Sequence, residues 1–141
     1  MVAKVFVDTD VIIDFLTERS PFSIFSSLIF DLHEKKIIEI YISAVSVNNI
    51  YYISRKLVGE AKARALISEL IANIEILGTT KNEIEQAFHT GFKDFEDSIQ
   101  YTTALTIENI EAIITRNIKD YKHSKIAVFT PEVYFDLKSP H

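Results

Sequence analysis

Short runs rich in β-branched residues alternate with longer segments of helical spacing, and this alternation restricts the folds open to the chain more than any other feature. In the clearest helical segment, apolar residues recur at intervals of three and four between Ala63 and Ile74. Strands that alternate with helices form a mostly parallel sheet with helices on both faces. The sequence therefore predicts an α/β fold, with strands at 3–7, 38–42, 74–77, 111–115 and 126–129.

Capping residues mark where three of the predicted helices begin. Asp10 stands at the start of a predicted helix over 11–18. Asp94 precedes a helical segment over 95–107. Thr130 is followed by proline and glutamate, a sequence typical of a first helical turn.

The composition indicates the class of protein and its compartment. Hydrophobic residues make up 48% of the 141 residues, with three glycines and three prolines, which suits one folded domain over residues 1–141. The chain has no cysteine, so disulfides and thiolate metal sites are excluded. No apolar run approaches the roughly 20 residues of a membrane-spanning helix, and no signal peptide is recognisable. We therefore expect a cytoplasmic protein with no membrane partner.

The net charge of −5 limits how the chain can meet nucleic acid. Proteins that coat nucleic acid through its phosphates are usually basic, so this charge argues against a coating or chromatin role. It leaves open an enzyme whose acidic residues bind a divalent cation before nucleic acid approaches.

Polar residues gather after the predicted strands, at the edge where parallel α/β sheets carry their functional groups. Asp8 and Asp10 follow the first strand, and the segment DFEDSIQYTTAL at 94–105 leads into the fourth from the same edge. The polar residues after the second and fourth strands are Ser43, Ser46, Asn48, Asn49, Thr115, Arg116, Asn117 and Asp120. Mg²⁺ and Mn²⁺ prefer such oxygen ligands, so the sequence favours a metal site at this edge.

Each acidic residue also has an explanation that involves no metal. Aspartate favours strand ends and helix caps, so Asp8 is as well explained by a turn or a cap as by a metal site. Asp97 differs, because it lies close to an apolar stripe where helix propensity calls for no acid. The remaining acids are expected at helix caps (Asp10, Asp94) or on solvated surfaces (Asp14, Glu96).

Four motifs follow one another along nearly the whole chain. They are VFVDTDVIIDFL at 5–16, ISAVSVNNIYYI at 42–53, DFEDSIQYTTAL at 94–105 and IITRNIKDY at 113–121. In this order and spacing they resemble the PIN-domain family, the fold of VapC-type toxin ribonucleases. The pairing of DFEDSIQ with TRN is the most specific part of the resemblance.

The resemblance implies a three-layer α/β/α sandwich around a parallel sheet of about five strands. It also implies an acidic pocket that binds Mg²⁺ or Mn²⁺ and hydrolyses RNA phosphodiesters. The family's first acid falls on Asp8 and its third on Asp97.

The chain departs from the family pattern at the other two acids. The second falls on Asn49 and the fourth on Asn117, so amides replace two carboxylates and the pocket is expected to be about two charges less negative. Asp94 and Asp120 are the nearby acids expected to supply metal-binding charge instead, although neither occupies the usual slot. We therefore expect the fold to be kept more strictly than the activity.

An active site of this kind would use a cation on Asp8 and Asp97 to activate a water that attacks the phosphorus. Asn49 and Asn117 would hold metal-bound waters or a substrate oxygen, and Thr115 would hydrogen-bond Asp97 or the ligand. A basic run is expected either to contact the RNA backbone or to form a solvated loop. Its members are Arg116, Lys119, Lys122 and Lys125.

The alternative function is a catalytically weak or inactive PIN-like module that binds nucleic acid or protein. The two amides favour this alternative, and the negative charge weakens its nucleic-acid version. Expected partners are RNA, an antitoxin protein in the VapC manner, and a second copy of the chain. The apolar segment PFSIFSSLIFDL at 21–32 is the surface expected to pack in such a homodimer.

Overall fold

Five short strands form one sheet in the order β3-β2-β1-β4-β5, and every neighbouring pair is parallel. The computed structural model describes residues 1–139; residues 140 and 141 of the expected domain lie outside this part. The strands are β1 (Ala3–Val7), β2 (Ile38–Ser43), β3 (Glu75–Leu77), β4 (Ile110–Ile114) and β5 (Ala127–Phe129). Their bounds differ from the predicted ones by no more than one residue at either end.

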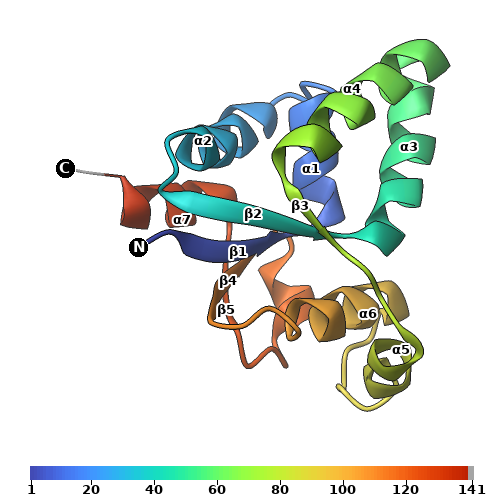
Figure 1. Cartoon of the computed structure of the whole chain (residues 1–141), viewed down its shortest axis with the longest axis vertical. Helices are drawn as coiled ribbons and strands as arrows, with labels where there is room; N and C mark the ends of the chain where they lie inside the picture. Colours follow the sequence, from blue (N-terminus) through green and yellow to red (C-terminus); the bar gives the residue numbers. More distant parts are fainter. Residues whose placement is uncertain (140–141) are drawn as a thin grey trace.

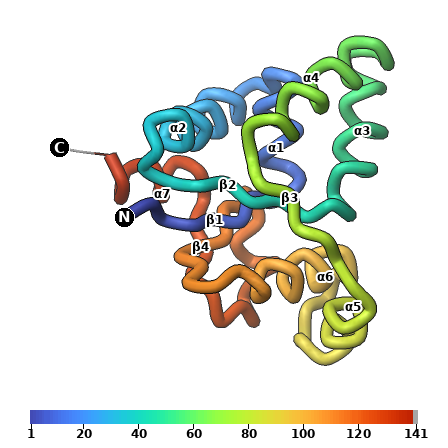
Figure 2. The backbone as a smooth tube through the Cα atoms, viewed as in Figure 1, coloured from blue at the N-terminus to red at the C-terminus, as the bar shows by residue number. Residues whose placement is uncertain are grey.

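Seven α-helices and a short 3-10 helix surround the sheet within the described residues. They are α1 (Thr9–Leu16), α2 (Ser23–Glu34), α3 (Ala44–Val58), α4 (Glu60–Asn73), α5 (Lys81–Ala87), α6 (Phe95–Ala104), η1 (Ile118–Tyr121) and α7 (Pro131–Lys138). In Figure 1, α1 to α4 lie above the sheet and α5 and α6 lie below it. Figure 2 shows α3 and α4 as a hairpin that extends away from the strands. The arrangement confirms the predicted α/β sandwich.

Alternation along the strands gives each face of the sheet its own core. On one face Val5 and Val7 pack with residues of α1, α2, α3, α4 and α7. On the other face Phe6 and Ile113 pack with α6 and Tyr121. Burial on both faces explains why the strands read as nearly continuous apolar runs.

Two of the three predicted caps are present, and the third is wrong. Asp94 caps α6, and the Thr130 hydroxyl accepts a hydrogen bond from the backbone N–H of Val133 at the start of α7. Helix α1, however, begins two residues before the predicted 11–18 helix, because Asp8 and not Asp10 caps it. Asp10 instead lies in the first turn, where a negative charge also suits the helix dipole.

The segment at 21–32 is largely used inside its own chain. Ile29, Phe30 and Leu32 are buried, and α2 packs against α1, α7 and β2. Ile24 remains 67% exposed on the outer side of the helix. Within residues 1–139, no helix combines the length and the apolar character needed to cross a membrane.

The strand order places a topological switch between β1 and β4. The chain runs outward from β1 to β2 and β3, then returns to place β4 on the other side of β1. Ligands of open α/β sheets bind beyond the carboxyl ends of the strands at such a switch. The residues directly after β1 and β4 are Asp8 and Thr115.

Candidate active site

Asp8 is a buried carboxylate held at the end of β1. Its backbone N–H donates to the carbonyl of Ile114 (2.9 Å), which continues the pairing of β1 with β4 by one residue. Its Oδ1 accepts from the N–H of Thr9 (2.8 Å), and its Oδ2 accepts from the hydroxyl of Thr115 (2.7 Å). Burial raises the pKa of Asp8 to about 6, because removal from water outweighs these hydrogen bonds.

Asp97 lies in the first turn of α6 and faces the same region. Burial raises its pKa to about 7, and the negative charges of Asp8, Asp94, Asp120 and Glu96 add to the shift in that order. Of these four charges, that of Asp8 makes the largest contribution to the raised pKa of Asp97. The fold therefore brings Asp8 close enough to Asp97 for the charge of Asp8 to oppose the ionisation of Asp97.

The donor set suits a hard cation that is completed by water. Both carboxylates have raised pKa values, so their ionised forms are disfavoured. A divalent cation between them would stabilise these ionised forms. Among residues 1–139, no three His, Cys, Asp or Glu side chains are arranged as a ready-made metal group. Waters would complete the coordination of such a cation, as Mg²⁺ commonly keeps several waters in proteins.

Thr115 contacts a different partner from the predicted one. Its hydroxyl donates to Asp8 and not to Asp97, and the same oxygen accepts from the N–H of Asn117 (3.1 Å). Because the Thr115 side chain is fully buried, this pair of bonds ties the end of β4 to the carboxylate after β1.

The two amides at the substituted positions each hold an acid from another element. Asn49 on α3 donates from Nδ2 to Oε1 of Glu96 on α6 (2.6 Å). Asn117 donates from Nδ2 to Oδ2 of Asp10 on α1 (3.2 Å). Each amide thus lies beside one acidic side chain. Neither pairing was predicted, since each joins residues from distant parts of the chain.

Asp94 and Asp120 lie at the edge of the carboxylate pair. Oδ1 of Asp94 accepts from the backbone N–H of Asp97 (2.9 Å), so this oxygen is already used by the cap of α6. Asp120 lies in η1 and is exposed. Both contribute charge to the environment of Asp97.

Arg116 is engaged within the fold. Its Nε lies 2.7 Å from Oδ2 of Asp14, and its guanidinium lies 4.0 Å from the centre of the Phe22 ring. The prediction that Asp14 is solvated is wrong, because its side chain is 1% exposed and also faces Arg19 at 3.7 Å. Helix α1 turns Asp14 inward, where these two arginines offset its charge.

Lys119 and Lys122 are both exposed, in the segment that follows β4. A hollow of about 410 Å³ is lined by residues 116–120 and lies beside Asn117.

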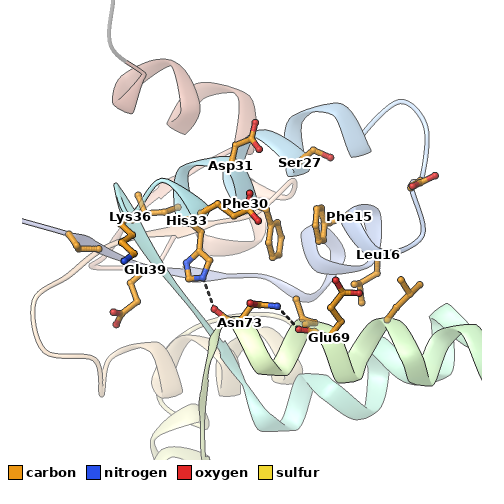
Figure 3. A pocket seen from close by; sticks show the side chains of 16 residues that line it. Phe15, Leu16, Ser27, Phe30, Asp31, His33, Lys36, Glu39, Glu69 and Asn73 are labelled. Carbon is orange, nitrogen blue, oxygen red and sulfur yellow. Dashed lines mark hydrogen bonds between the residues drawn. The ribbon is translucent and has the colours of Figure 1, made fainter.

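A larger hollow of about 880 Å³ lies elsewhere, between α1, α2, α4 and β2. None of the predicted site residues lines it (Figure 3). Phe15 and Phe30 stack in its wall with ring centres 3.7 Å apart. Nδ1 of His33 accepts from the N–H of Ile40, so Nε2 carries the hydrogen and donates to the carbonyl of Asn73. This hollow is therefore separate from the carboxylate pair of Asp8 and Asp97.

Sequence reasoning also missed Tyr121. It directly follows the TRNIKD segment, and the charges of Asp8, Asp97, Asp10 and Asp120 reach its hydroxyl. The sequence shows that Tyr121 ends the fourth motif, but it does not show that the side chain is buried.

Comparison with known proteins agrees with this geometry. The family model described as PIN domain matches residues 4–119. Ribonuclease VapC1 of Aquifex aeolicus is 30% identical over 136 residues, which covers 93% of this chain and 92% of that protein.

Solved structures share the fold at lower identity. VapBC2 from Rickettsia felis bound to a promoter DNA fragment has a TM-score of 0.68 at 15% identity, covering 90% of this chain and 98% of that chain. A toxin-antitoxin complex from Klebsiella pneumoniae has a TM-score of 0.65 at 22% identity, covering 90% and 97%. VapC20 of Mycobacterium tuberculosis, a sarcin-ricin loop cleaving toxin, has a TM-score of 0.62 at 15% identity, covering 77% and 86%. Family model, relative and fold agree, and the chain belongs to the PIN-domain family.

Proposed function

We propose that the chain is a metal-dependent endoribonuclease that works in the cytoplasm as one domain and hydrolyses RNA phosphodiesters. The observation that carries the proposal is the carboxylate pair of the buried Asp8 and the half-buried Asp97 at the topological switch of the sheet. The likeness to Ribonuclease VapC1 supports the reaction class.

Asp8 and Asp97 would hold Mg²⁺ or Mn²⁺ in this function. When bound, such a cation lowers the pKa of a water and offsets charge on the phosphoryl oxygens. Thr115 keeps Asp8 in one orientation through its hydrogen bond, and Asp94 fixes the first turn that carries Asp97. The carboxylates are thus positioned before any ligand enters.

The neighbouring polar residues would serve substrate binding. Asn49 and Asn117 would orient waters through their carbonyl oxygens, or donate to a phosphate oxygen through the second hydrogen of each NH₂ group, since Glu96 and Asp10 each take only one. Lys119 and Lys122 would contact the RNA backbone. We assign Arg116 a structural role, because its guanidinium is already paired with the carboxylate of Asp14.

One observation favours the non-catalytic alternative. Glu96 and Asp10 accept hydrogen bonds from the amides of Asn49 and Asn117, so these two carboxylates have partners without a metal. In that case the PIN fold would bind RNA or protein without cleaving it.

Cleavage of single-stranded RNA separates the two functions. We expect the wild-type chain to cleave in Mn²⁺ and to stop in excess EDTA, and Asp97→Asn to lose at least about 100-fold in rate. Asp136→Asn is the matched control, because Asp136 is an exposed aspartate on α7. Equal cleavage by Asp97→Asn, or cleavage in EDTA, would remove the mechanism; RNA binding without cleavage would favour the alternative.

We further propose an antitoxin partner and a homodimer. The solved VapBC and toxin-antitoxin complexes support the partner class, and the exposed Ile24 on α2 supports a contact between copies. Light scattering of the purified chain measures the dimer directly, and a monomeric mass would reject it.

The hollow in Figure 3 fits a basic amphipathic segment of such an antitoxin. Its wall is aromatic, and its acidic residues outnumber its one lysine; the charged residues are Glu18, Asp31, Glu34, Glu39, Glu69 and Lys36. Apolar contact with complementary charge at the rim is the usual form of helix-in-groove binding.

Charge reversal at the rim tests this surface. Asp31→Lys combined with Glu69→Lys should abolish co-purification of a basic partner from native cells, because both side chains are exposed and only complementarity changes. Asp136→Lys, away from the hollow, should retain the partner. Retention of the partner by the double variant would place the antitoxin elsewhere.

A further inference from the structure

Helix α3 has the opposite charge from the chain as a whole. It contains two basic residues, Arg55 and Lys56, and no acidic residue. Every other helix within residues 1–139 has at least as many acidic residues as lysines and arginines. In a chain of net charge −5, the surface of α3 is therefore the helical surface that best suits an anionic partner.

An exposed tyrosine lies beside these cations. Tyr52 is 47% exposed, and the guanidinium of Arg55 lies 5.1 Å from the centre of its ring. The same guanidinium lies 6.0 Å from the ring centre of Tyr51, and the two tyrosine rings meet edge to face. No carboxylate of residues 1–139 forms an ion pair with Arg55 or Lys56. The positive charge of this cluster is thus not offset by a neighbouring acid.

Helix stability explains only part of this arrangement. Cations in the last turn suit the helix dipole, and an arginine over a tyrosine ring gains from cation–π attraction. Both effects are complete within α3, yet they leave Tyr52 open to solvent. An exposed ring with cations and no acid beside it is the combination that binds single-stranded nucleic acid, because bases stack on the ring and cations contact the phosphates.

The exposed side of α3 begins at the candidate active site. Asn49, Tyr52 and Lys56 recur at intervals of four residues or three, so they lie on one side of the helix. Asn49 donates to Glu96, the residue before Asp97. With a rise of about 1.5 Å per residue, Tyr52 lies about 4.5 Å and Lys56 about 10 Å beyond Asn49 along the axis. Figure 2 shows α3 running away from the strands, so a chain that leaves the site past Asn49 meets Tyr52 and then Lys56.

Two other occupants fit this side of α3 less well than RNA. The hollow proposed for an antitoxin lies between α1, α2, α4 and β2, and no described residue of α3 lines it. A second copy that met α3 across a two-fold axis would place the same two cations against each other. RNA carries negative charge along its whole backbone and complements both cations.

We propose that the side of α3 formed by Tyr52, Arg55 and Lys56 binds the single-stranded RNA next to the scissile linkage. An unpaired base stacks against the Tyr52–Arg55 pair, and Lys56 contacts a phosphate. This inference rests on the proposed ribonuclease function. Because the carboxylate pair lies beyond Asn49, the α3 surface supplies affinity for RNA and takes no part in the cleavage step.

Tyr52→Ala removes the ring and leaves the carboxylates in place. We expect its dissociation constant for fluorescein-labelled, mixed-sequence single-stranded RNA to rise at least about five-fold, the effect of losing one stacked base. Anisotropy titration with Ca²⁺ in place of Mn²⁺ measures this on intact RNA. Tyr52→Phe keeps the ring and should bind like the wild type. Wild-type affinity in Tyr52→Ala would overturn the inference and leave the proposed function intact.

Leu137→Ala is the matched control for the loss of an exposed apolar side chain. Leu137 lies on α7 and is exposed. Figure 1 places α7 and α3 at opposite ends of the view. The control variant should therefore bind RNA like the wild type, and an equal loss of affinity in Leu137→Ala and Tyr52→Ala would contradict a local contact.

Salt dependence tests the phosphate contact. A cation that neutralises one phosphate of a single strand contributes about 0.7 to the slope of log affinity against log salt. Lys56→Ala should reduce the slope by about this amount. Lys35→Ala, at an exposed lysine that ends α2, should leave the slope unchanged. Equal slopes for Lys56→Ala and the wild type would contradict the inference.

Single-turnover cleavage in Mn²⁺ separates binding from chemistry. Below saturation, Tyr52→Ala should cleave more slowly than the wild type by the factor that its dissociation constant rises, and at saturating enzyme it should cleave at the wild-type rate. A wild-type chain that binds RNA but does not cleave it would refute the ribonuclease, and the titrations would still decide the α3 surface. A Tyr52→Ala variant with a changed mass in light scattering but unchanged RNA affinity would give the surface to a second copy and overturn the inference. A wild-type chain that neither binds nor cleaves RNA would overturn both.

Discussion

Two short hydrogen bonds hold the carboxylate of Asp8, and the one from Thr115 comes from a side chain, beside a weaker contribution from the Gln100 side chain. The other short bond comes from the backbone N–H of Thr9. At the scale of single residues, the orientation of the carboxylate proposed to bind the metal therefore depends mainly on the buried hydroxyl of Thr115.

Thr115→Val should weaken Mn²⁺ binding about ten-fold, because partners that orient a metal ligand are worth roughly 10- to 100-fold in affinity. The side chain keeps its shape but no longer donates to Asp8. Thr115→Ser should keep most of the affinity, since it retains the hydroxyl. Calorimetric titration with Mn²⁺ measures both, and wild-type affinity in the valine variant would contradict the role given to Thr115.

Arg116 differs from its lysine neighbours in what its charge contacts. Arg116→Ala should lower the free energy of unfolding by about 3 kcal/mol, because it leaves the buried Asp14 carboxylate without its nearest cation. Lys119→Ala should leave stability unchanged, because Lys119 is exposed. Urea unfolding measures both variants; an Arg116→Ala variant as stable as the wild type would return Arg116 to the RNA-contacting group.

At the scale of elements, α7 is fastened to β4 by one acid. Glu111 on β4 accepts hydrogen bonds from Lys138 Nζ (2.6 Å) and from the hydroxyl of Tyr134, both on α7. Burial alone would raise the pKa of Glu111, but the hydrogen bonds from Lys138 and Tyr134 outweigh it and lower the pKa below its ordinary 4.5.

This lowered pKa predicts how the stability of the chain depends on pH. The unfolded chain binds the proton of Glu111 more readily than the folded chain does. The contribution of Glu111 is therefore complete above pH 4.5 and is lost as pH falls through the lower folded pKa. Glu111→Gln should melt below the wild type at pH 7, by an amount that reflects at most about 1 kcal/mol for a partly exposed pair. The gap should close near pH 3, and a gap that stays constant with pH would contradict this account.

At the scale of the whole molecule, the sheet and the position of the carboxylate edge could be predicted from sequence. Strand and helix periodicities are local, and the rule that sites lie beyond parallel strand ends needs only the strand order. These two facts place Asp8 and Thr115 at the same edge of the sheet, but they do not show that the two residues form a hydrogen-bonded pair.

The parts that sequence could not predict depend on how elements meet. Asp8 and Asp10 are equally good caps by type, and the register of β1 against β4 decides that Asp8 begins α1. Asp14 is buried beside the nearby Arg19 and the distant Arg116. Asn49 meets Glu96 only because α3 and α6 approach at the same edge. Tyr121 was missed because nothing in a sequence shows that its side chain is buried.

The central claim is that Asp8 and Asp97 jointly hold a divalent cation. Anomalous diffraction from a crystal soaked in Mn²⁺ tests it most directly. We expect one strong peak in contact with a carboxylate oxygen of each residue, at roughly 2.0–2.3 Å, and no such peak for Asp97→Asn. No peak between the two carboxylates in the wild-type crystal, or a peak held only by other residues, would contradict the claim.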